Sequence, residues 1–363
     1  MNRTAQDSIR QATRNYEQWM RGCTRIIGSQ LATKHEKMRG DLPSFFRATY
    51  YRWAQLWPDE CEEVCDGPEV LSVGDLHVDS FGTWRDSEGR LCWGVDDFDE
   101  SYPLPYTNDL VRLTASLRIA IDAESLSIGF KDGCEAILES YRKTLQSGGR
   151  PMVLAECETK LGKLGFECIK PPEKFWKGLN ERPAVQEGLP ADAKKALEAT
   201  FPDPKLDYKV VRREAGLGSL GQERFVAIAQ WYGNCIAREA KAMLPSACVW
   251  LNGGKNSGQP FYRKAMNSPI RPCDPYQQIA GKWLIRRLSP DSNPIYIADL
   301  PAERDEEALV QAMGCEAANV HLGTSKEIKN ILKDLQGRKA KWLSAAGKHM
   351  AKVMKREWKE YAE

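Results

Sequence analysis

Two short acidic motifs stand at the two ends of one segment: residues 74–77 read Gly-Asp-Leu-His, and residues 97–100 read Asp-Phe-Asp-Glu. Between them, two apolar runs flank a turn-forming cluster at residues 86–89. This pattern predicts a β-hairpin. Because a hairpin brings its ends together, the carboxylates of Asp75 and Asp97 are expected at one end of a small sheet.

Phosphoryl transfer uses carboxylates in this arrangement, because one orients the attacking hydroxyl and another holds magnesium. The segment supplies one histidine and several acids: Asp75, His77, Asp79, Asp97, Asp99 and Glu100. Packed like charges repel one another unless a cation or hydrogen bonds offset them, so a divalent cation explains the cluster. The alternative is an acidic edge exposed to solvent. His77 is expected to orient the loop, as a lone histidine in such a loop usually does.

The chain has 363 residues, enough for two lobes or two domains with their own apolar cores. Its 52 Lys and Arg residues nearly balance 50 Asp and Glu residues, so the whole molecule offers no broad attraction to nucleic acid or anionic membrane. Residues 326–363 hold 11 Lys and Arg against 5 Asp and Glu. On an amphipathic helix such a tract is usually a solvated face, so nucleic acid is not the expected partner.

The 11 cysteines are scattered and odd in number, which does not indicate a disulfide framework. Cys61 and Cys65 are closely spaced, but no second Cys or His pair matches their spacing, so buried thiols are expected there rather than a metal site. The first residues are polar, and no apolar stretch of about 18 residues is present. We therefore expect a reducing cytoplasm, where ATP is available, and no membrane partner.

The residues before the hairpin are expected to be mainly helical. Apolar residues at helical spacing predict a helix over residues 8–35, and an aromatic-rich helix follows that begins at Asp41. Residues 70–73 are expected to form a strand that leads into Gly74. A helix pair therefore precedes the acidic segment.

After the hairpin, Pro103 and Pro105 predict a non-helical loop, and Asn108 is a natural N-cap for the next helix. A further helix is expected over residues 130–146. Residues 151–205 are expected to form short helices and loops.

From Tyr208 the pattern changes to strands, and from about residue 302 it returns to helices. The predicted parts are N-terminal helices of the helical lobe at 1–66, the catalytic-loop hairpin and helical lobe at 67–205, a β-rich nucleotide-binding lobe at 206–300, and C-terminal helices at 301–363.

A glycine-rich loop, Gly-Leu-Gly-Ser-Leu-Gly, occupies residues 216–221 between two predicted strands. Its pattern alone is a weak signal, because dinucleotide-binding folds, kinases and plain turns all use it. A strand after the loop, where a dinucleotide-binding fold requires a helix, favours a flap that covers nucleotide phosphates with backbone N–H groups. A hairpin whose glycines only turn the chain is the alternative. Arg238 and Lys241 follow as candidate phosphate-binding cations, unless they lie at a solvated strand end.

Several motifs resemble the DUF2252 family of uncharacterised bacterial proteins: GDLHVDSFG at 74–82, VDDFDE at 95–100, NDLVRL at 108–113, RREAGLGSLG at 212–221, REAKA at 238–242 and RRLSPDS at 286–292. More distantly, the chain resembles the aminoglycoside and choline phosphotransferase branch of the protein-kinase-like fold.

This resemblance implies an α+β, two-lobed, protein-kinase-like fold that binds ATP and Mg²⁺. Asp75 would then position the acceptor hydroxyl, Asp97 would bind magnesium, and Asp109 would brace the catalytic loop. The residues that would cover the phosphates are Gly216, Gly218, Ser219 and Gly221. Ordinary kinases place the glycine-rich lobe before the catalytic loop, whereas this chain places it after, so the resemblance implies a circularly permuted fold.

Two positions depart from the family pattern. Ser80 stands where an asparagine usually supplies a second metal ligand, so that site is expected to be looser unless Asp79 or Asp99 substitutes. Arg238 stands where a lysine is expected, which leaves Lys241 as a displaced candidate, although arginine still binds phosphate in a fork.

The leading hypothesis is an ATP- and magnesium-dependent phosphotransferase that acts on a hydroxyl of a small molecule. The alternative is a catalytically degenerate nucleotide-binding protein or interaction module of the same fold, which Ser80 and Arg238 favour. Variable helices and loops, here residues 151–205 and 252–282, are expected to select the acceptor.

Overall fold

The computed structural model describes residues 7–156, 171–185, 187–254, 260–267, 270–292, 294–297 and 305–363. The described α-helices are α1 (Ile9–Cys23), α2 (Gly28–Gly40), α3 (Leu42–Ala48), α4 (Tyr50–Glu60), α5 (Thr107–Asp122), α6 (Phe130–Ser147), α8 (Pro172–Asn180), α9 (Ala191–Glu198), α10 (Ala247–Leu251), α11 (Pro260–Met266), α12 (Glu306–His321), α13 (Ile328–Gly337) and α14 (Trp342–Ala362). The described strands are β1 (Glu69–Ser72), β2 (Phe81–Arg85), β3 (Leu91–Val95), β4 (Tyr102–Pro105), β5 (Met152–Val153), β6 (Tyr208–Arg212), β7 (Arg224–Trp231), β8 (Asn234–Ala242), β9 (Gln278–Ala280) and β10 (Trp283–Leu288). Helices and sheets are thus both present, as the expected α+β class requires.

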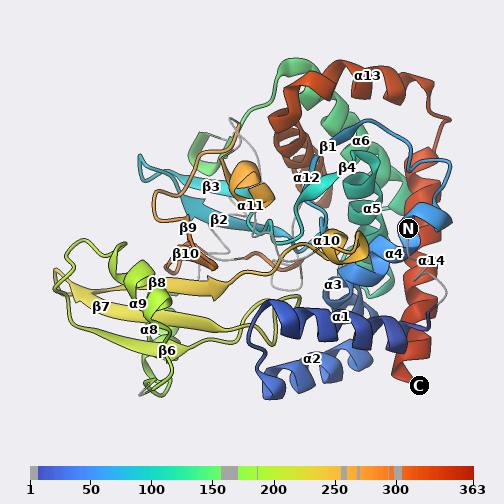
Figure 1. Cartoon of the computed structure of the whole chain (residues 1–363). Coiled ribbons are helices and arrows are strands. Elements are labelled where there is room, and N and C mark those ends of the chain that lie inside the picture. Colours follow the sequence, from blue (N-terminus) through green and yellow to red (C-terminus); the bar gives the residue numbers. More distant parts are fainter. Residues whose placement is uncertain are drawn as a thin grey trace.

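The largest sheet has five antiparallel strands in the order β6-β7-β8-β10-β9 and lies to one side of the helices (Figure 1). Tyr232 and Gly233 turn the chain between β7 and β8 with φ angles of 48° and 78°. One face of the sheet packs its apolar side chains, including Phe225 and Trp283, against α9. The inner part of the opposite face carries charged residues, because side chains alternate along each strand. This charged face is turned to the candidate site.

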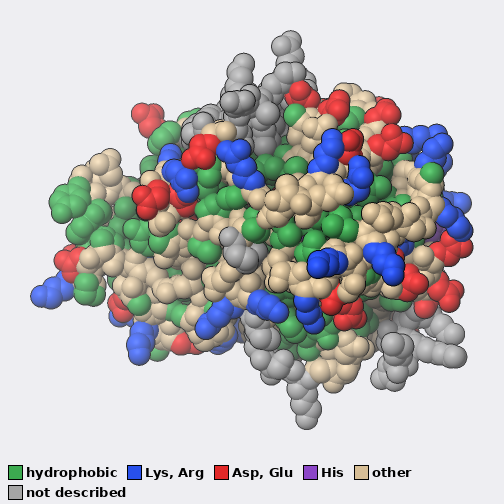
Figure 2. All heavy atoms as spheres, turned by 90° about the horizontal axis from the view of Figure 1, so that it is seen from above, with side chains coloured by type: hydrophobic (Ala, Val, Ile, Leu, Met, Phe, Trp, Pro, Cys, Tyr) green, Lys and Arg blue, Asp and Glu red, His purple; other side chains and the backbone are tan. Residues whose placement is uncertain are grey.

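The helical part is built around α5, which is buried along most of its length between α14 and other helices. Helix α12 packs along α6, and the long α14 packs along α5, so the last part of the chain completes the core begun by the first (Figure 1). On the face seen in Figure 2, acidic and basic side chains are interleaved over the helices. Among the described residues, no helix combines the length and apolar composition that crossing a bilayer requires.

The predicted hairpin is confirmed. Strands β2 and β3 pair antiparallel, with Phe81 opposite Val95 and Arg85 opposite Leu91. Asp86 accepts hydrogen bonds from the backbone N–H groups of Glu88 and Arg90 and thereby closes the turn. The first acidic motif precedes β2 and the second follows β3. Both motifs therefore lie at the open end of the hairpin, opposite its turn.

One expectation about the N-terminal part needs correction, and another is confirmed. The predicted helix over 8–35 is two helices, because the chain is extended around Thr24 and Ile26 forms a bridge with Gln222. A run of β-branched residues at this point favours extended backbone over helix. The expectation that Asp41 begins the next helix is confirmed, since Asp41 Oδ1 accepts a hydrogen bond from Ser44 N at 2.6 Å.

The segment after the hairpin also differs from expectation. Pro103 and Pro105 lie in strand β4, which pairs with β1, rather than in a loop. Proline is tolerated there because β1 and β4 form a two-stranded sheet, so each strand has an unpaired edge. Asn108 is not the N-cap of α5, which begins at Thr107. Its side chain instead donates to the carbonyl of Gly74 at 3.2 Å.

The remaining predicted elements are found within the described residues, whereas residues 157–170 and 186 of the predicted 151–205 segment lie outside them. Gly148, in the left-handed region at φ 84°, ends α6 as expected, and strands β6, β7 and β10 cover the predicted β segments. The nine described cysteines are free thiols, whereas Cys157 and Cys168 lie outside the described residues.

Candidate functional site

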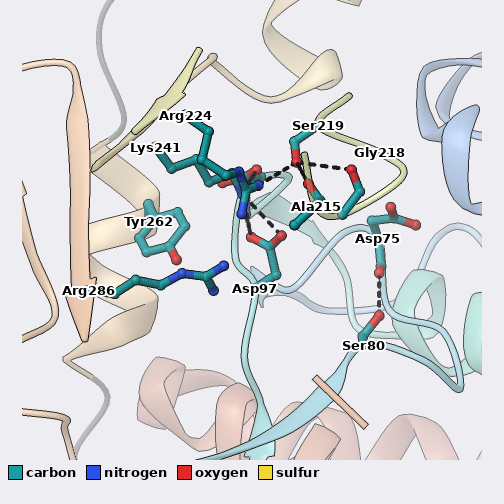
Figure 3. Close-up of polar contacts among 12 residues, drawn as sticks. Asp75, Ser80, Asp97, Ala215, Gly218, Ser219, Arg224, Lys241, Tyr262 and Arg286 are labelled. Carbon is teal, nitrogen blue, oxygen red and sulfur yellow. Dashed lines mark hydrogen bonds and ion pairs between the residues drawn. The ribbon is translucent and has the colours of Figure 1, made fainter. Parts of the chain in front are cut away.

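The glycine-rich loop and the acidic motifs meet around one cavity of about 150 Å³, although they are far apart in the chain (Figure 3). The sequence-predicted site residues that line it are Asp75, His77, Ser80, Asp97, Asp99, Gly216, Gly218 and Ser219. Lys241 reaches the same place through its contacts with the acids. Arg238 and Gly221 are not among the lining residues.

The loop that carries Asp75 is shaped by a glycine and a serine. Gly74 has φ 82°, and a Cβ there would lie 2.3 Å from the carbonyl oxygen of Glu100, so only glycine fits. Ser80 Oγ donates to the carbonyl of Asp75 at 3.0 Å and accepts from the backbone N–H of His77 at 3.0 Å. The Ser80 hydroxyl is therefore engaged in holding the loop.

The Asp75 carboxylate lies against a buried arginine. Arg112 Nε donates to Asp75 Oδ1 at 2.7 Å, and Arg112 Nη2 donates to the same oxygen. The guanidinium is stacked among aromatic rings, with its centre 4.2 Å from the ring of Phe46 and 4.9 Å from that of Trp53. Burial raises the pKa of Asp75, and the nearby Arg112 partly offsets that rise.

Asp109 braces the same loop from the first turn of α5. Its carboxylate accepts hydrogen bonds from the backbone N–H groups of Val73 at 2.7 Å and Gly74 at 3.0 Å. His321 Nε2 lies 3.0 Å from the same carboxylate. Burial alone would raise the pKa of Asp109, but hydrogen bonds from His321, Ser72 and the backbone hold it below its ordinary value. The resemblance assigned this bracing role to Asp109, and the contacts fit it.

Asp97 and Asp99 share the ammonium of Lys241. Lys241 Nζ lies 3.2 Å from Asp97 Oδ2 and also contacts Asp99 Oδ2, while its side chain is only 2% exposed. Burial and the neighbouring Asp97 raise the pKa of Asp99 to about 6, although Lys241 opposes the rise. Burial also acts on Asp97, but Lys241 and nearby arginines hold its pKa below the ordinary value.

The described residues contain no group of three or more His, Cys, Asp or Glu side chains placed to hold a metal ion. Magnesium, however, needs only one or two protein carboxylates when substrate phosphates and waters complete its shell. Asp99 Oδ1 is buried without a hydrogen-bond partner among the described residues, and the Asp97 side chain is 49% exposed. These two carboxylates fit a magnesium ion that a nucleotide brings with it.

Three arginines converge on one buried carboxylate beside the acids, and sequence reasoning missed them. Glu239 accepts hydrogen bonds from Arg213 at 2.7 Å, Arg224 at 3.1 Å and Arg286 at 2.6 Å. All three arginines line the cavity. The three positive charges hold the pKa of Glu239 well below its ordinary value, against the opposing effect of burial. Asp96 also acts on Arg286, and Asp97 acts on Arg224, so further carboxylates lie near these guanidinium groups. Guanidinium groups in the wall of a cavity nevertheless suit phosphate oxygens, which they bind in a fork.

The glycine-rich loop is fastened to helix α2. Lys34 Nζ donates to the carbonyl of Gly218 at 2.7 Å, and Ile27 N donates to the carbonyl of Gly221 at 2.8 Å. Lys34 is buried, which lowers its pKa to about 8. Within the loop, Ser219 Oγ accepts from Arg224 Nη2 at 2.8 Å (Figure 3). The loop is therefore held over the cavity from both the helical and the sheet side.

Arg238 points away from this cavity. On β8 it alternates with Glu239 and Lys241, so its side chain lies on the sheet's other face. There Arg238 Nε donates to the carbonyl of Thr200 at 3.1 Å, and its guanidinium lies 4.0 Å from the ring centre of Tyr276. The structure thus brings Lys241, and not Arg238, to the acids.

Comparison with known proteins gives one family. Residues 25–163 match the model of a family described as an uncharacterized protein conserved in bacteria (DUF2252). No curated protein and no solved structure matches the chain. The matched segment contains the Asp75 loop, the acidic hairpin, α5 and α6, whereas the glycine-rich loop lies beyond it. The similarity to this family therefore covers residues 25–163, which is less than half of the chain.

Proposed function

We propose that this protein is an ATP- and magnesium-dependent phosphotransferase that acts on a hydroxyl of a small molecule. The proposal includes a circularly permuted kinase-like arrangement, in which the helical lobe with the catalytic loop precedes the glycine-rich lobe. The observation that carries it is the shared cavity: Gly216 and Gly218 line one side, and Asp75 and Asp97 line the other. Segments so distant in the sequence meet where phosphoryl transfer would need them.

The charges of the cavity support a triphosphate in a defined direction. The arginine group around Glu239 and the backbone of the glycine-rich loop lie on the sheet side and would bind phosphate oxygens. Magnesium, held by Asp97 and Asp99, would supply charge neutralisation on the phosphates. Asp75 stands on the helical side, where it would accept the proton of the attacking hydroxyl. Its raised pKa makes the carboxylate a better proton acceptor than an ordinary aspartate.

The cavity must open before it holds a nucleotide. Its volume of about 150 Å³ is below the roughly 300–1,000 Å³ that small-molecule sites usually offer. The contact between Lys34 and the Gly218 carbonyl holds the loop down, so entry of ATP requires this hydrogen bond to break. In this proposal the glycine-rich loop lifts and its backbone N–H groups turn to the phosphates.

A second candidate function is nucleotide binding without transfer, by a degenerate protein or interaction module of the same fold. The contacts of Lys241 favour it, because one ammonium is bound to both carboxylates that would hold magnesium. The engaged hydroxyl of Ser80 favours it as well, since that oxygen already has a donor and an acceptor partner.

The test has two stages that separate these candidates. Isothermal titration of the protein with magnesium and the non-hydrolysable analogue AMP-PNP measures binding, which both candidates require. Phosphorus NMR of ATP, with magnesium and a panel of neutral alcohols, polyols and amino alcohols, then measures transfer. Magnesium-dependent formation of a phosphate ester supports the phosphotransferase. Binding without any ester supports the second candidate, and the absence of binding contradicts both.

A further inference from the structure

A second cavity adjoins the first on the helical side. It has a volume of about 350 Å³, larger than the cavity beneath the glycine-rich loop. Four side chains line both cavities: Arg47, His77, Asp79 and Tyr296. The wall between the two cavities is therefore shared by the Asp75 loop, by Arg47 of α3 and by Tyr296.

The lining of the second cavity combines an apolar part with polar residues. Its apolar residues come from α3, the Asp75 loop, α5 and the segment before residue 298: Pro43, Phe46, Val78, Ile119, Ala120 and Ile297. The hydroxyl of Ser116 is used within the protein, because it donates to the carbonyl of Leu113 at 2.7 Å and accepts from Val78 N at 3.0 Å. Such a lining favours a ligand with an apolar body.

The charged residues of this cavity are already matched. Arg47 Nη1 donates to Asp79 Oδ2 at 2.8 Å, and Asp79 Oδ1 accepts from Ile297 N at 2.8 Å. Asp41 accepts from the backbone N–H and the hydroxyl of Ser44 at the start of α3. Among the described lining residues, no positive charge is left over to balance an anionic ligand. A neutral ligand fits this balance better than a phosphorylated or acidic one.

Two hydrogen-bond donors remain at the wall between the cavities. Arg47 Nε is buried and has no acceptor among the described residues. His77 Nδ1 accepts from Asp79 N at 3.2 Å, which leaves the ring proton of the neutral imidazole on Nε2. Both donors suit an oxygen atom of a ligand that spans this wall.

We infer that the second cavity is the acceptor site, and that it takes a neutral alcohol with an apolar body. The hydroxyl lies at the wall shared with the first cavity, on the side of Asp75, and an oxygen of the ligand accepts from Arg47 Nε. Phosphorylation of the bound alcohol rests on the proposed phosphotransferase function, whereas its binding in the second cavity does not.

The experiment uses the full chain and four probes: 1-hexanol, cyclohexylmethanol, 2-phenylethanol and the anionic analogue phenylacetate. Saturation-transfer NMR at millimolar probe concentration measures binding. The unaltered chain is expected to bind the alcohols and to bind phenylacetate more weakly. Ala120→Phe, which fills the cavity from α5, is expected to weaken alcohol binding by about tenfold or more. Ala123→Phe is the matched control, because Ala123 is exposed beyond the end of α5.

Arg47→Lys is the second variant, because it keeps the charge beside Asp79 and removes the Nε donor. We expect alcohol binding to weaken by about fivefold. The inference is overturned if the unaltered chain binds none of the alcohols, or if a folded Ala120→Phe protein binds them as the Ala123→Phe control does. Titration with magnesium and AMP-PNP in the same samples separates the two proposals. Alcohol binding without nucleotide binding supports the cavity assignment and contradicts the phosphotransferase. Nucleotide binding without alcohol binding contradicts the cavity assignment and leaves the phosphotransferase supported.

Discussion

Arg112 donates two hydrogen bonds to a single oxygen of Asp75, Oδ1, from the buried side of the loop. The arginine is itself fixed, because Nη2 also donates to the carbonyl of Phe46 at 3.0 Å and its plane lies among aromatic rings. Arg112 thus orients the carboxylate through Oδ1 alone. The second oxygen, Oδ2, accepts no hydrogen bond from Arg112. A positioned carboxylate of this kind suits a general base better than a structural acid.

Replacing Asp75 by Asn is expected to abolish transfer while nucleotide binding is kept. The amide has nearly the same shape but cannot accept the hydroxyl proton, and general-base catalysis contributes about 10²–10⁴-fold. Transfer is measured by phosphorus NMR and affinity by titration with magnesium and AMP-PNP. Asp66→Asn is the matched control, because the Asp66 side chain is 80% exposed. Full transfer activity of the Asp75 variant would falsify the assignment of the base.

Replacing Arg213 by Met is expected to weaken nucleotide affinity by about tenfold or more, the usual effect of losing one hydrogen bond to a charged group. Arg213 lines the cavity and donates to Glu239 at 2.7 Å. Arg212→Met is the control on the adjacent residue, since the Arg212 guanidinium lies 4.8 Å from the ring centre of Phe225 on the sheet's other face. The same titration is used for both proteins. If the two variants bind the nucleotide with equal affinity, Arg213 does not bind phosphate and the proposed role of the arginine group is wrong.

The sequence allowed the acidic hairpin and the glycine-rich loop to be predicted, because both depend on local patterns of turns and alternation. The choice between Arg238 and Lys241 is different. Alternation along β8 separates their faces, but only the pairing of β8 with β7 and β10 decides which face meets the acids. Local sequence contains no information about that pairing.

The same reason explains the missed arginines and Lys34. Arg213, Arg224 and Arg286 come from different strands or their ends, and they meet at Glu239 only after the sheet forms. Lys34 lies on a helix that contacts the glycine-rich loop across more than half the chain. The sequence offered one signal for these arginines, an Arg-Arg pair that precedes the glycine-rich loop and occurs again at residues 286–287. Taken alone, each pair has the pattern of a strand end exposed to solvent.

Replacing Lys34 by Met is expected to loosen the glycine-rich loop. The substitution removes the donor to the Gly218 carbonyl, and that carbonyl then loses a charge-assisted hydrogen bond. Hydrogen exchange followed by mass spectrometry should show faster exchange in peptides that cover residues 215–222, with little change in β7 and β8. Lys37→Met, at an exposed position on α2, is the control. If both variants exchange alike, Lys34 is not the residue that holds the loop down.

Replacing Glu100 by Gln is expected to change how stability depends on pH. Glu100 is partly enclosed in the cavity wall, and its Oε2 accepts from Ala247 N at 2.6 Å. Burial, with smaller effects from Asp75 and Asp99, raises its pKa from 4.5 to about 8. A carboxyl whose pKa is higher in the folded state stabilises that state while protonated. This contribution is complete below pH 4.5 and is lost as the pH rises to about 8.

The Gln variant lacks this loss because an amide does not ionise. We measure the free energy of unfolding of both proteins by urea denaturation. The value of the Gln variant minus that of the unaltered protein should rise by a few kcal/mol between about pH 5 and pH 8. Glu63→Gln is the control, because its side chain is 86% exposed and should not respond in this way. If the difference in free energy of unfolding between the two proteins stays constant across this pH range, the pKa of Glu100 in the folded protein is not raised.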